Sequence, residues 1–164
     1  MPVKISDITN PRIAEILKLQ IPKQKKKRRA SRRLEDSLQK ICVKWFDLQY
    51  PHMSQLLFAI PNGGGYNHKI SKKGVRFSPE GNRMKAMGVR KGVLDVHFME
   101  PRGGFFGLWL ELKVDKNVMD TDQIEFTRLA RARNHKVVEI RTLEQFIYEI
   151  TSYLKLPLTI KGAT

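Results

Sequence analysis

The chain has 164 residues, with 31 Lys and Arg against 16 Asp and Glu and a formal net charge of +15. This length suits one domain with a substantial core. The charge indicates a polyanionic partner such as DNA, RNA or an acidic membrane, with a basic solvated surface as the alternative. The single cysteine, Cys42, excludes an internal disulfide and a cysteine-based zinc site.

The first residues, "MPVKISDITNPR", contain no apolar stretch typical of a secretory signal. No run of about eighteen apolar residues is present, so the sequence predicts no membrane-spanning segment. We expect a cytoplasmic protein without a membrane partner or a small-molecule cofactor.

Residues 1–30 are predicted to form a short helix and a basic arm. Asn10 and Pro11 suit the start of a helix over residues 11–19, which is too short to be stable alone and is expected to pack on a partner subunit. Residues 23–33 contain eight basic residues, a block that repels itself. We interpret it as a linker or arm; a solubilising segment or a localisation signal is the alternative.

A strong helix is predicted from Ser31, its expected N-cap, to Pro51. Its apolar side chains recur at helical spacing: Leu34, Leu38, Ile41, Trp45 and Leu48. Residues 55–62 then read as a strand. Residues 63–91 have no clear period and are Gly-rich and basic, so we expect a long loop.

Residues 92–99 and 105–114 alternate as strands and should pair as a hairpin. The pattern puts Leu94, Val96 and Phe98 on one face and Val93, Asp95, His97 and Met99 on the other. In the second strand, Leu108, Leu110, Leu112 and Val114 should face the core, opposite Trp109, Glu111 and Lys113. Packing is the expected role of Trp109 and His97.

The last elements are a helix over residues 120–136, a strand over 136–141 and a helix over 142–156. Asp120 and Gln123 resemble a capping box, Asn134 suits a left-handed C-terminal turn, and Thr142 suits an N-cap. The order αβββαβα predicts an α/β sandwich with a mixed sheet over residues 31–156, followed by a tail over 157–164.

Asp95 and Glu111 are therefore predicted side by side on adjacent strands. Two such carboxylates repel, and a hard divalent cation such as Mg²⁺ relieves the repulsion. Lys113, on the same face, is suited to orient or deprotonate a water molecule and to offset charge on a phosphate. The alternative is a half-exposed strand with ordinary alternating charges.

These residues resemble the PD-(D/E)xK nuclease superfamily, whose sandwich is restriction-endonuclease-like, and most closely its VRR-NUC (virus-type replication-repair nuclease) family. The resemblance runs from about Glu35 to about Tyr153. It is carried by "EDSLQ", "PNG", "GVRKGVLD", "ELK" and "DQIEF". One departure is Leu94, where the superfamily has proline. Short stand-alone forms are often encoded by phages.

The resemblance implies a role for each matching position. Asp95, Glu111 and the carbonyl of Leu112 would bind Mg²⁺ or Mn²⁺, and Lys113 would be the catalytic lysine. Glu35 would supply a further carboxylate acting on metal and water, and Gln123 would lie near the metal, with helix capping as its alternative role. Gly88 and Gly92 would shape the turn before Asp95. Relatives also suggest a homodimer.

The DNA contacts expected of this chain are Asn62, Arg76, Arg83, Lys85, Arg90 and Lys91. Three functions stay open. A metal-dependent endonuclease for branched, flap or four-way-junction DNA in replication, repair or recombination is favoured, because the basic loop offers no evident base-reading helix. The others are a sequence-reading restriction-type nuclease and a non-catalytic DNA-binding protein.

Overall fold

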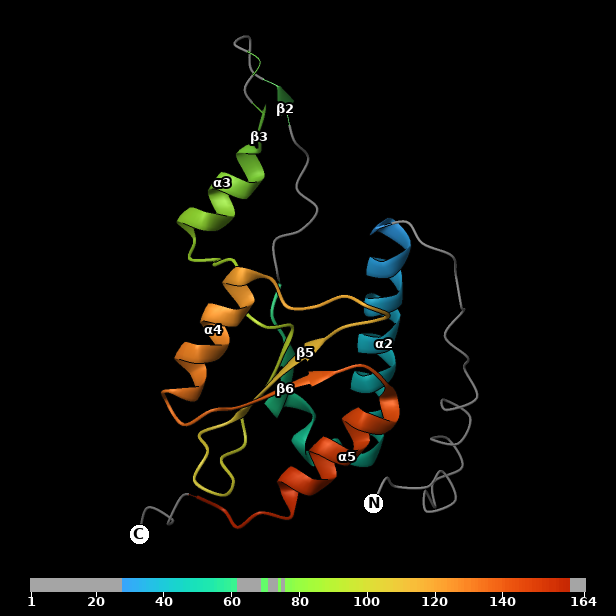
Figure 1. Ribbon diagram of the computed structural model, residues 1–164. Helices are drawn as coiled ribbons and strands as arrows, with labels where there is room; N and C mark the ends of the chain where they lie inside the picture. Colours follow the sequence, from blue (N-terminus) through green and yellow to red (C-terminus); the bar gives the residue numbers. More distant parts are fainter. Residues whose placement is uncertain (1–27, 62–68, 71–73, 75, 160–164) are drawn as a thin grey trace.

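The computed structural model of the chain describes residues 28–61, 69–70, 74 and 76–159. Its elements run in the following order (Figure 1): α2 (Arg28–Gln49), the 3-10 helix η2 (Pro51–Leu56), β1 (Leu57–Ala59), β2 (Lys69–Ile70), β3 (Arg76–Phe77), α3 (Pro79–Ala86), β4 (Val96–Phe98), β5 (Leu108–Leu112), α4 (Thr121–Arg131), β6 (Lys136–Ile140) and α5 (Leu143–Leu154). The N-terminal helix and most of the basic arm predicted from the sequence lie outside the described residues.

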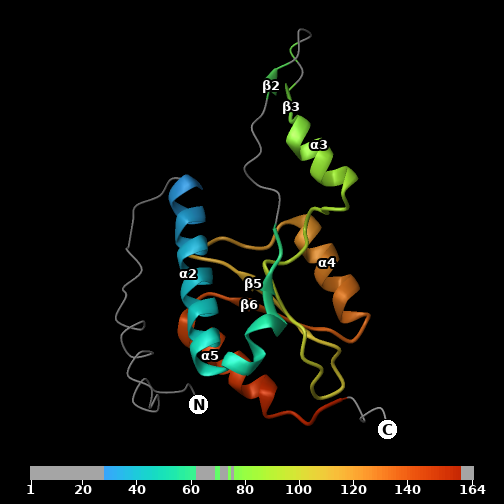
Figure 2. The ribbon, with the colours of Figure 1, turned by 180° about the vertical axis from the view of Figure 1, so that it is seen from behind.

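Four strands form a mixed sheet in the order β1-β4-β5-β6. β4 pairs antiparallel with β1 and with β5, whereas β5 and β6 are parallel. Helices α2 and α5 lie on one face of the sheet and α4 lies on the other, as the two opposite views show (Figures 1 and 2). The predicted hairpin and the predicted mixed α/β sandwich are thus confirmed.

The main core fills the space between the sheet and the pair α2 and α5. The predicted stripe of α2 enters it: Leu38 and Trp45 are buried, and Leu34, Ile41 and Leu48 pack against its edge. Alternate residues of the central strands complete it, as the strand period requires: Val96, Phe98, Leu108, Leu110 and Leu112. This core fixes the sheet against α2, and both the sheet and α2 carry candidate site residues.

A second, smaller cluster lies under α4. It contains Leu94, Ala130 and Val137, with Trp109 and Phe126 packed against it. Leu94 was predicted to face the same way as Val96, and this prediction is wrong. β4 begins only at Val96, so the strict alternation of a strand does not extend back to Leu94.

Two element boundaries also differ from the predictions. α2 begins at Arg28, so Ser31 lies inside the helix rather than at its N-cap. The strand predicted over residues 55–62 is confined to Leu57–Ala59, because Pro51 starts a 3-10 helix that runs to Leu56. The later helix caps agree with the predictions: Asp120 and Gln123 form a capping box, Thr142 caps α5, and Asn134 is left-handed with φ 55.

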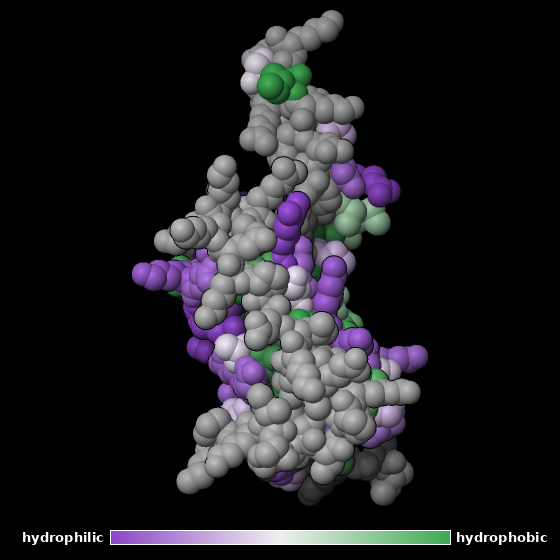
Figure 3. Space-filling view, turned by 90° about the vertical axis from the view of Figure 1, so that its right-hand side faces the viewer, coloured by the Kyte–Doolittle hydropathy of each residue, from purple (hydrophilic) through white to green (hydrophobic). Residues whose placement is uncertain are grey.

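The segment expected to be one long loop contains a two-stranded sheet, β2-β3, and the helix α3. Ser78 accepts a hydrogen bond from the backbone N–H of Gly81, and Pro79 occupies the first turn, so Ser-Pro was the helix-start signal that the prediction missed. This segment extends beyond the rest of the described protein (Figures 1 and 3). Within the described residues, no helix is both long and apolar enough to cross a membrane.

Candidate active site

The β4-β5 ladder brings the two predicted carboxylates together. It pairs Val96 with Leu110, and Asp95 and Glu111 are the residues directly next to this pair in the two chain segments. Asp95 is anchored there because its Oδ2 accepts a hydrogen bond of 2.9 Å from the backbone N–H of Leu112. After burial, the charge of Asp95 is the second cause that raises the pKa of Glu111.

Glu111 is a fully buried carboxylate, with 0% of its surface exposed. Burial, and then the charge of Asp95, raise its pKa to about 7, although Lys113 opposes them. Among the described residues, no hydrogen-bond partner reaches its Oε2 atom. A buried oxygen of this kind is costly unless something pairs with it.

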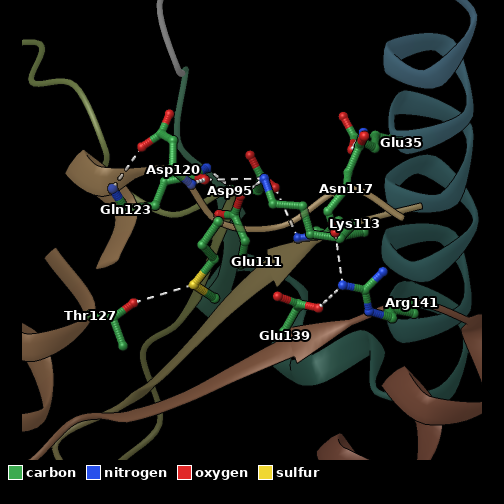
Figure 4. A network of polar contacts seen from close by, with 12 residues as sticks. Glu35, Asp95, Glu111, Lys113, Asn117, Asp120, Gln123, Thr127, Glu139 and Arg141 are labelled. Atoms are coloured by element: carbon green, nitrogen blue, oxygen red, sulfur yellow. Dashed lines mark hydrogen bonds and ion pairs between the residues drawn. The ribbon is translucent and has the colours of Figure 1, made fainter. Parts of the chain in front are cut away.

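Lys113 is the direct partner of the other Glu111 oxygen. Its Nζ lies 2.7 Å from Glu111 Oε1 and donates to Gln123 Oε1 at 3.1 Å. Burial alone lowers the pKa of Lys113, but the hydrogen bond and charge of Glu111 outweigh it and the net pKa is raised. The lysine is therefore a cation held in place inside the site (Figure 4).

Gln123 combines the two roles that the sequence left open. Its side-chain oxygen accepts from the backbone N–H of Asp120 at 3.0 Å, which completes the capping box of α4. Its side-chain nitrogen donates to Glu111 Oε1. The start of α4 is thereby tied to the carboxylate of β5.

Glu35 comes from α2, the helix that covers the face of the sheet opposite to α4 (Figures 1 and 4). Its Oε1 accepts a hydrogen bond of 2.9 Å from Asn117 Nδ2, and its charge contributes to raising the pKa of Lys113. Asn117 was not predicted. It lies in the loop that leaves β5 directly after the Glu-Leu-Lys motif, and this adjacency was the available signal.

Arg141 and Glu139 were also missed. The parallel register sets Glu139 beside Glu111 on the same face of the sheet. Arg141 pairs with Glu139 and donates to the loop after β5. Sequence reasoning had placed β6 but not its register, so the neighbours of Glu111 on that side could not be named.

Of the predicted DNA contacts, Arg83, Lys85, Arg90 and Lys91 are all exposed. Lys91 lies 3.7 Å from Asp122 in the first turn of α4, which places it next to the site. Arg83 and Lys85 belong to α3, in the protruding segment. Asn62 and the side chain of Arg76 lie outside what the structure describes.

Gly92 holds this turn close to α4. Its φ is +76, and a Cβ atom there would lie 2.3 Å from the backbone carbon of Asp122. Gly88 also has a positive φ, of +98, so both predicted turn glycines adopt the conformation that glycine favours. The backbone before Asp95 can thus pack directly on the helix that carries Gln123.

His97 and Trp109 have packing roles, as expected. Their rings lie 4.2 Å apart, and Trp109 makes an edge contact with Phe126 of α4 at 5.0 Å. Burial, followed by the charge of His135, lowers the pKa of His97 to about 4.

The donor set fits a hard divalent cation. Asp95 and Glu111 offer carboxylate oxygens, and the unpaired Oε2 of Glu111 is an oxygen that a cation would satisfy. In the described part of the chain, no three His, Cys, Asp or Glu side chains gather into one possible metal site. Binding would therefore depend on two carboxylates with backbone and solvent oxygens, and Glu35 as a ligand stays a prediction.

Comparison with known proteins identifies the class of fold. A solved structure described as a "VRR_NUC domain protein" superposes with a TM-score of 0.59 at 21% sequence identity, covering 75% of this chain and 89% of that chain. The chain therefore has the fold of a VRR-NUC domain protein, as the sequence resemblance predicted. No family model matches the sequence, and no curated protein matches it.

Proposed function

We propose that the protein is a metal-dependent DNA endonuclease of the VRR-NUC type, in the PD-(D/E)xK superfamily. The observation that carries the proposal is the buried pair Glu111 and Lys113 beside Asp95, with Glu111 Oε2 left without a partner among the described residues. A buried pair on the face of a strand is costly for stability alone, which favours a functional reason for it. The shared fold supports the same conclusion.

Asp95, Glu111 and the carbonyl of Leu112 would hold Mg²⁺ or Mn²⁺. The cation would lower the pKa of a water molecule and offset charge on the phosphate. Lys113 would orient the attacking water and stabilise negative charge on the phosphate, since its raised pKa keeps it protonated. Gln123 would hold the Glu111 carboxylate at the correct angle.

The exposed cations Arg83, Lys85, Arg90 and Lys91 would contact phosphates and position the DNA. The described residues of this region form a protruding segment with an eight-residue helix rather than a helix presented by the body of the domain. Among the described residues, this segment therefore offers no long helix for reading bases in the major groove. Structure-selective cleavage in replication, repair or recombination is the form of the proposal that we favour.

The test uses the purified 164-residue chain with labelled plain duplex, flap, splayed-arm and four-way-junction DNA, each with Mg²⁺, Mn²⁺ or EDTA. We expect cutting of a branched DNA that requires metal and is abolished by Glu111→Gln and Asp95→Asn. Glu125→Gln, at an exposed pair with Arg128, is the matched control and should cut normally.

The panel also separates the alternatives. Discrete cuts in the plain duplex would establish a restriction-type nuclease instead. Tight binding without cutting in either metal would overturn the enzyme and leave a DNA-binding protein. A homodimer remains part of the proposal, together with a helix over residues 11–19 that packs on the partner subunit. The packing of this helix on the partner fails as a proposal if the chain without residues 1–22 keeps the same oligomeric state in solution.

A further inference from the structure

Arg141 directly follows β6 and contacts the loop that leaves the neighbouring strand β5. Its Nη1 donates to the carbonyl of Asp115 at 2.8 Å, and its Nη2 donates to the carbonyl of Asn117 at 2.8 Å. The same guanidinium pairs with Glu139. A guanidinium is a planar, rigid fork, so these contacts together fix the backbone of the loop against the sheet.

The loop needs such contacts to keep its shape. Asp115 has a φ of 53, in a region that residues with a Cβ atom adopt rarely. The turn is closed by the backbone N–H of Asn117, which donates to the carbonyl of Val114 at 3.1 Å. Arg141 binds both residues on either side of the loop apex, so it holds the strained conformation in place.

This loop connects the two layers of the site. It starts at Lys113, next to Glu111 on the α4 face, and it reaches α2 on the other face, where Asn117 Nδ2 donates to Glu35 Oε1 at 2.9 Å (Figure 4). Asn117 is exposed and Glu35 is half-buried, so water competes for this hydrogen bond. The bond therefore persists only where the Asn117 backbone is held, which is what Arg141 does.

We propose that Arg141 and Asn117 are positioning residues that hold Glu35 in its working orientation. This inference rests on the proposed nuclease function and adds residues to the same site. Arg141 serves the site in a second way, because its charge compensates Glu139, which the β5-β6 register places beside Glu111.

The test compares wild type with Asn117→Ala, Arg141→Gln and Arg141→Lys on the DNA that the wild type cuts. We expect each substitution to lower the single-turnover cleavage rate by about tenfold to a hundredfold, the effect of misplacing one catalytic group. DNA affinity should stay within about twofold for Asn117→Ala. Arg141→Lys keeps the positive charge beside Glu139, but a lysine cannot bind both loop carbonyls as the planar guanidinium does. This variant should therefore lose activity while remaining folded.

Two readouts distinguish positioning from a general structural role. In a Glu35→Gln background, Asn117→Ala should cause no further loss, because both act through one carboxylate. Hydrogen exchange at the Asn117 amide should become faster in Arg141→Gln. Arg133→Gln is the matched control, since the Arg133 guanidinium donates to the carbonyl of Leu129 and the residue lies just beyond the C-terminal end of α4.

The experiment distinguishes failure of the positioning role from failure of the nuclease proposal. If wild type cuts and Lys113→Met does not, but Asn117→Ala and Arg141→Gln cut at the wild-type rate, the positioning role is wrong and the nuclease stands. Additive losses with Glu35→Gln would also overturn it. If wild type cuts no DNA, the proposed function fails and this inference falls with it.

Discussion

The side chain of Gln123 donates a hydrogen bond to the buried carboxylate of Glu111 while its oxygen receives the backbone N–H of Asp120 and the ammonium of Lys113. One amide thus closes the capping box of α4 and fixes the central charges of the site. Capping and site chemistry are not alternatives at this position. The loss of Gln123 and the loss of Asp120 should therefore have different effects on cleavage.

Gln123→Ala should destabilise the protein modestly and reduce cleavage strongly. Loss of its half of the capping box costs about 1 kcal/mol. Asp120→Ala is the matched control, because it removes the other half of the same box without removing any contact to Glu111. Thermal unfolding should show similar losses for both, whereas cleavage rates should fall at least about tenfold more for Gln123→Ala. Equal rates would mean that Gln123 acts only as a cap.

Gly92→Ala should destabilise the protein far more than Gly88→Ala. Both glycines have positive φ, which costs a residue with a Cβ atom roughly 1–2 kcal/mol. Only at Gly92 would the new atom meet the backbone of Asp122, whereas nothing lies within 4 Å at Gly88. Chemical denaturation of both variants measures the difference. Equal free energies of unfolding would show that the turn does not pack on α4 as described.

Acid should weaken the protein through His97. Its folded pKa is lowered to about 4, chiefly by burial, while the unfolded chain titrates near about 6.5. Between these two pKa values the unfolded state binds a proton at His97 that the folded state does not bind. The free energy of unfolding therefore falls as the pH drops from about 6.5 to about 4. His97→Gln should remove this acid-induced loss, which is on the order of 3 kcal/mol between pH 6.5 and pH 4. Chemical denaturation across this pH range measures the effect, and a profile identical in wild type and His97→Gln would contradict it.

Mg²⁺ should stabilise the folded protein through Glu111. A cation that binds only the folded state at about ten times its dissociation constant adds about 1.4 kcal/mol, or roughly 3 °C in melting temperature. Thermal unfolding with and without Mg²⁺ should show this shift in wild type and not in Glu111→Gln. The shift should persist in Glu125→Gln. A shift that survives in Glu111→Gln would place the cation elsewhere.

The sequence predicted the parts of the fold that local patterns determine. Alternation in residues 105–114, the spacing of Leu34, Leu38 and Trp45, and the Asp120 capping box each reflect contacts between residues close in the chain, and each appears in the structure. Asp95, Glu111 and Lys113 could be brought together because strands that are consecutive in the chain commonly pair as a hairpin, as β4 and β5 do.

What the sequence did not predict depends on register and on contacts between distant elements. Glu139 meets Glu111 only through a parallel pairing whose register no short turn fixes. Arg141 and Asn117 meet across a gap of 24 residues in the chain. Leu94 turned away from Val96 because the strand starts later than its pattern suggested. Such residues carry no local signal that distinguishes them from ordinary surface charges.

The most direct test of the central claim is single-turnover cleavage of labelled branched DNA by wild type and by Lys113→Met, each with Mg²⁺ and with EDTA, beside the DNA affinity of both. Removing the ammonium while keeping the length of the side chain should leave DNA binding nearly unchanged and lower the Mg²⁺-dependent rate by about a hundredfold to a thousandfold. Cleavage that continues in EDTA, or at the wild-type rate in Lys113→Met, would contradict a metal-dependent site built on Asp95, Glu111 and Lys113.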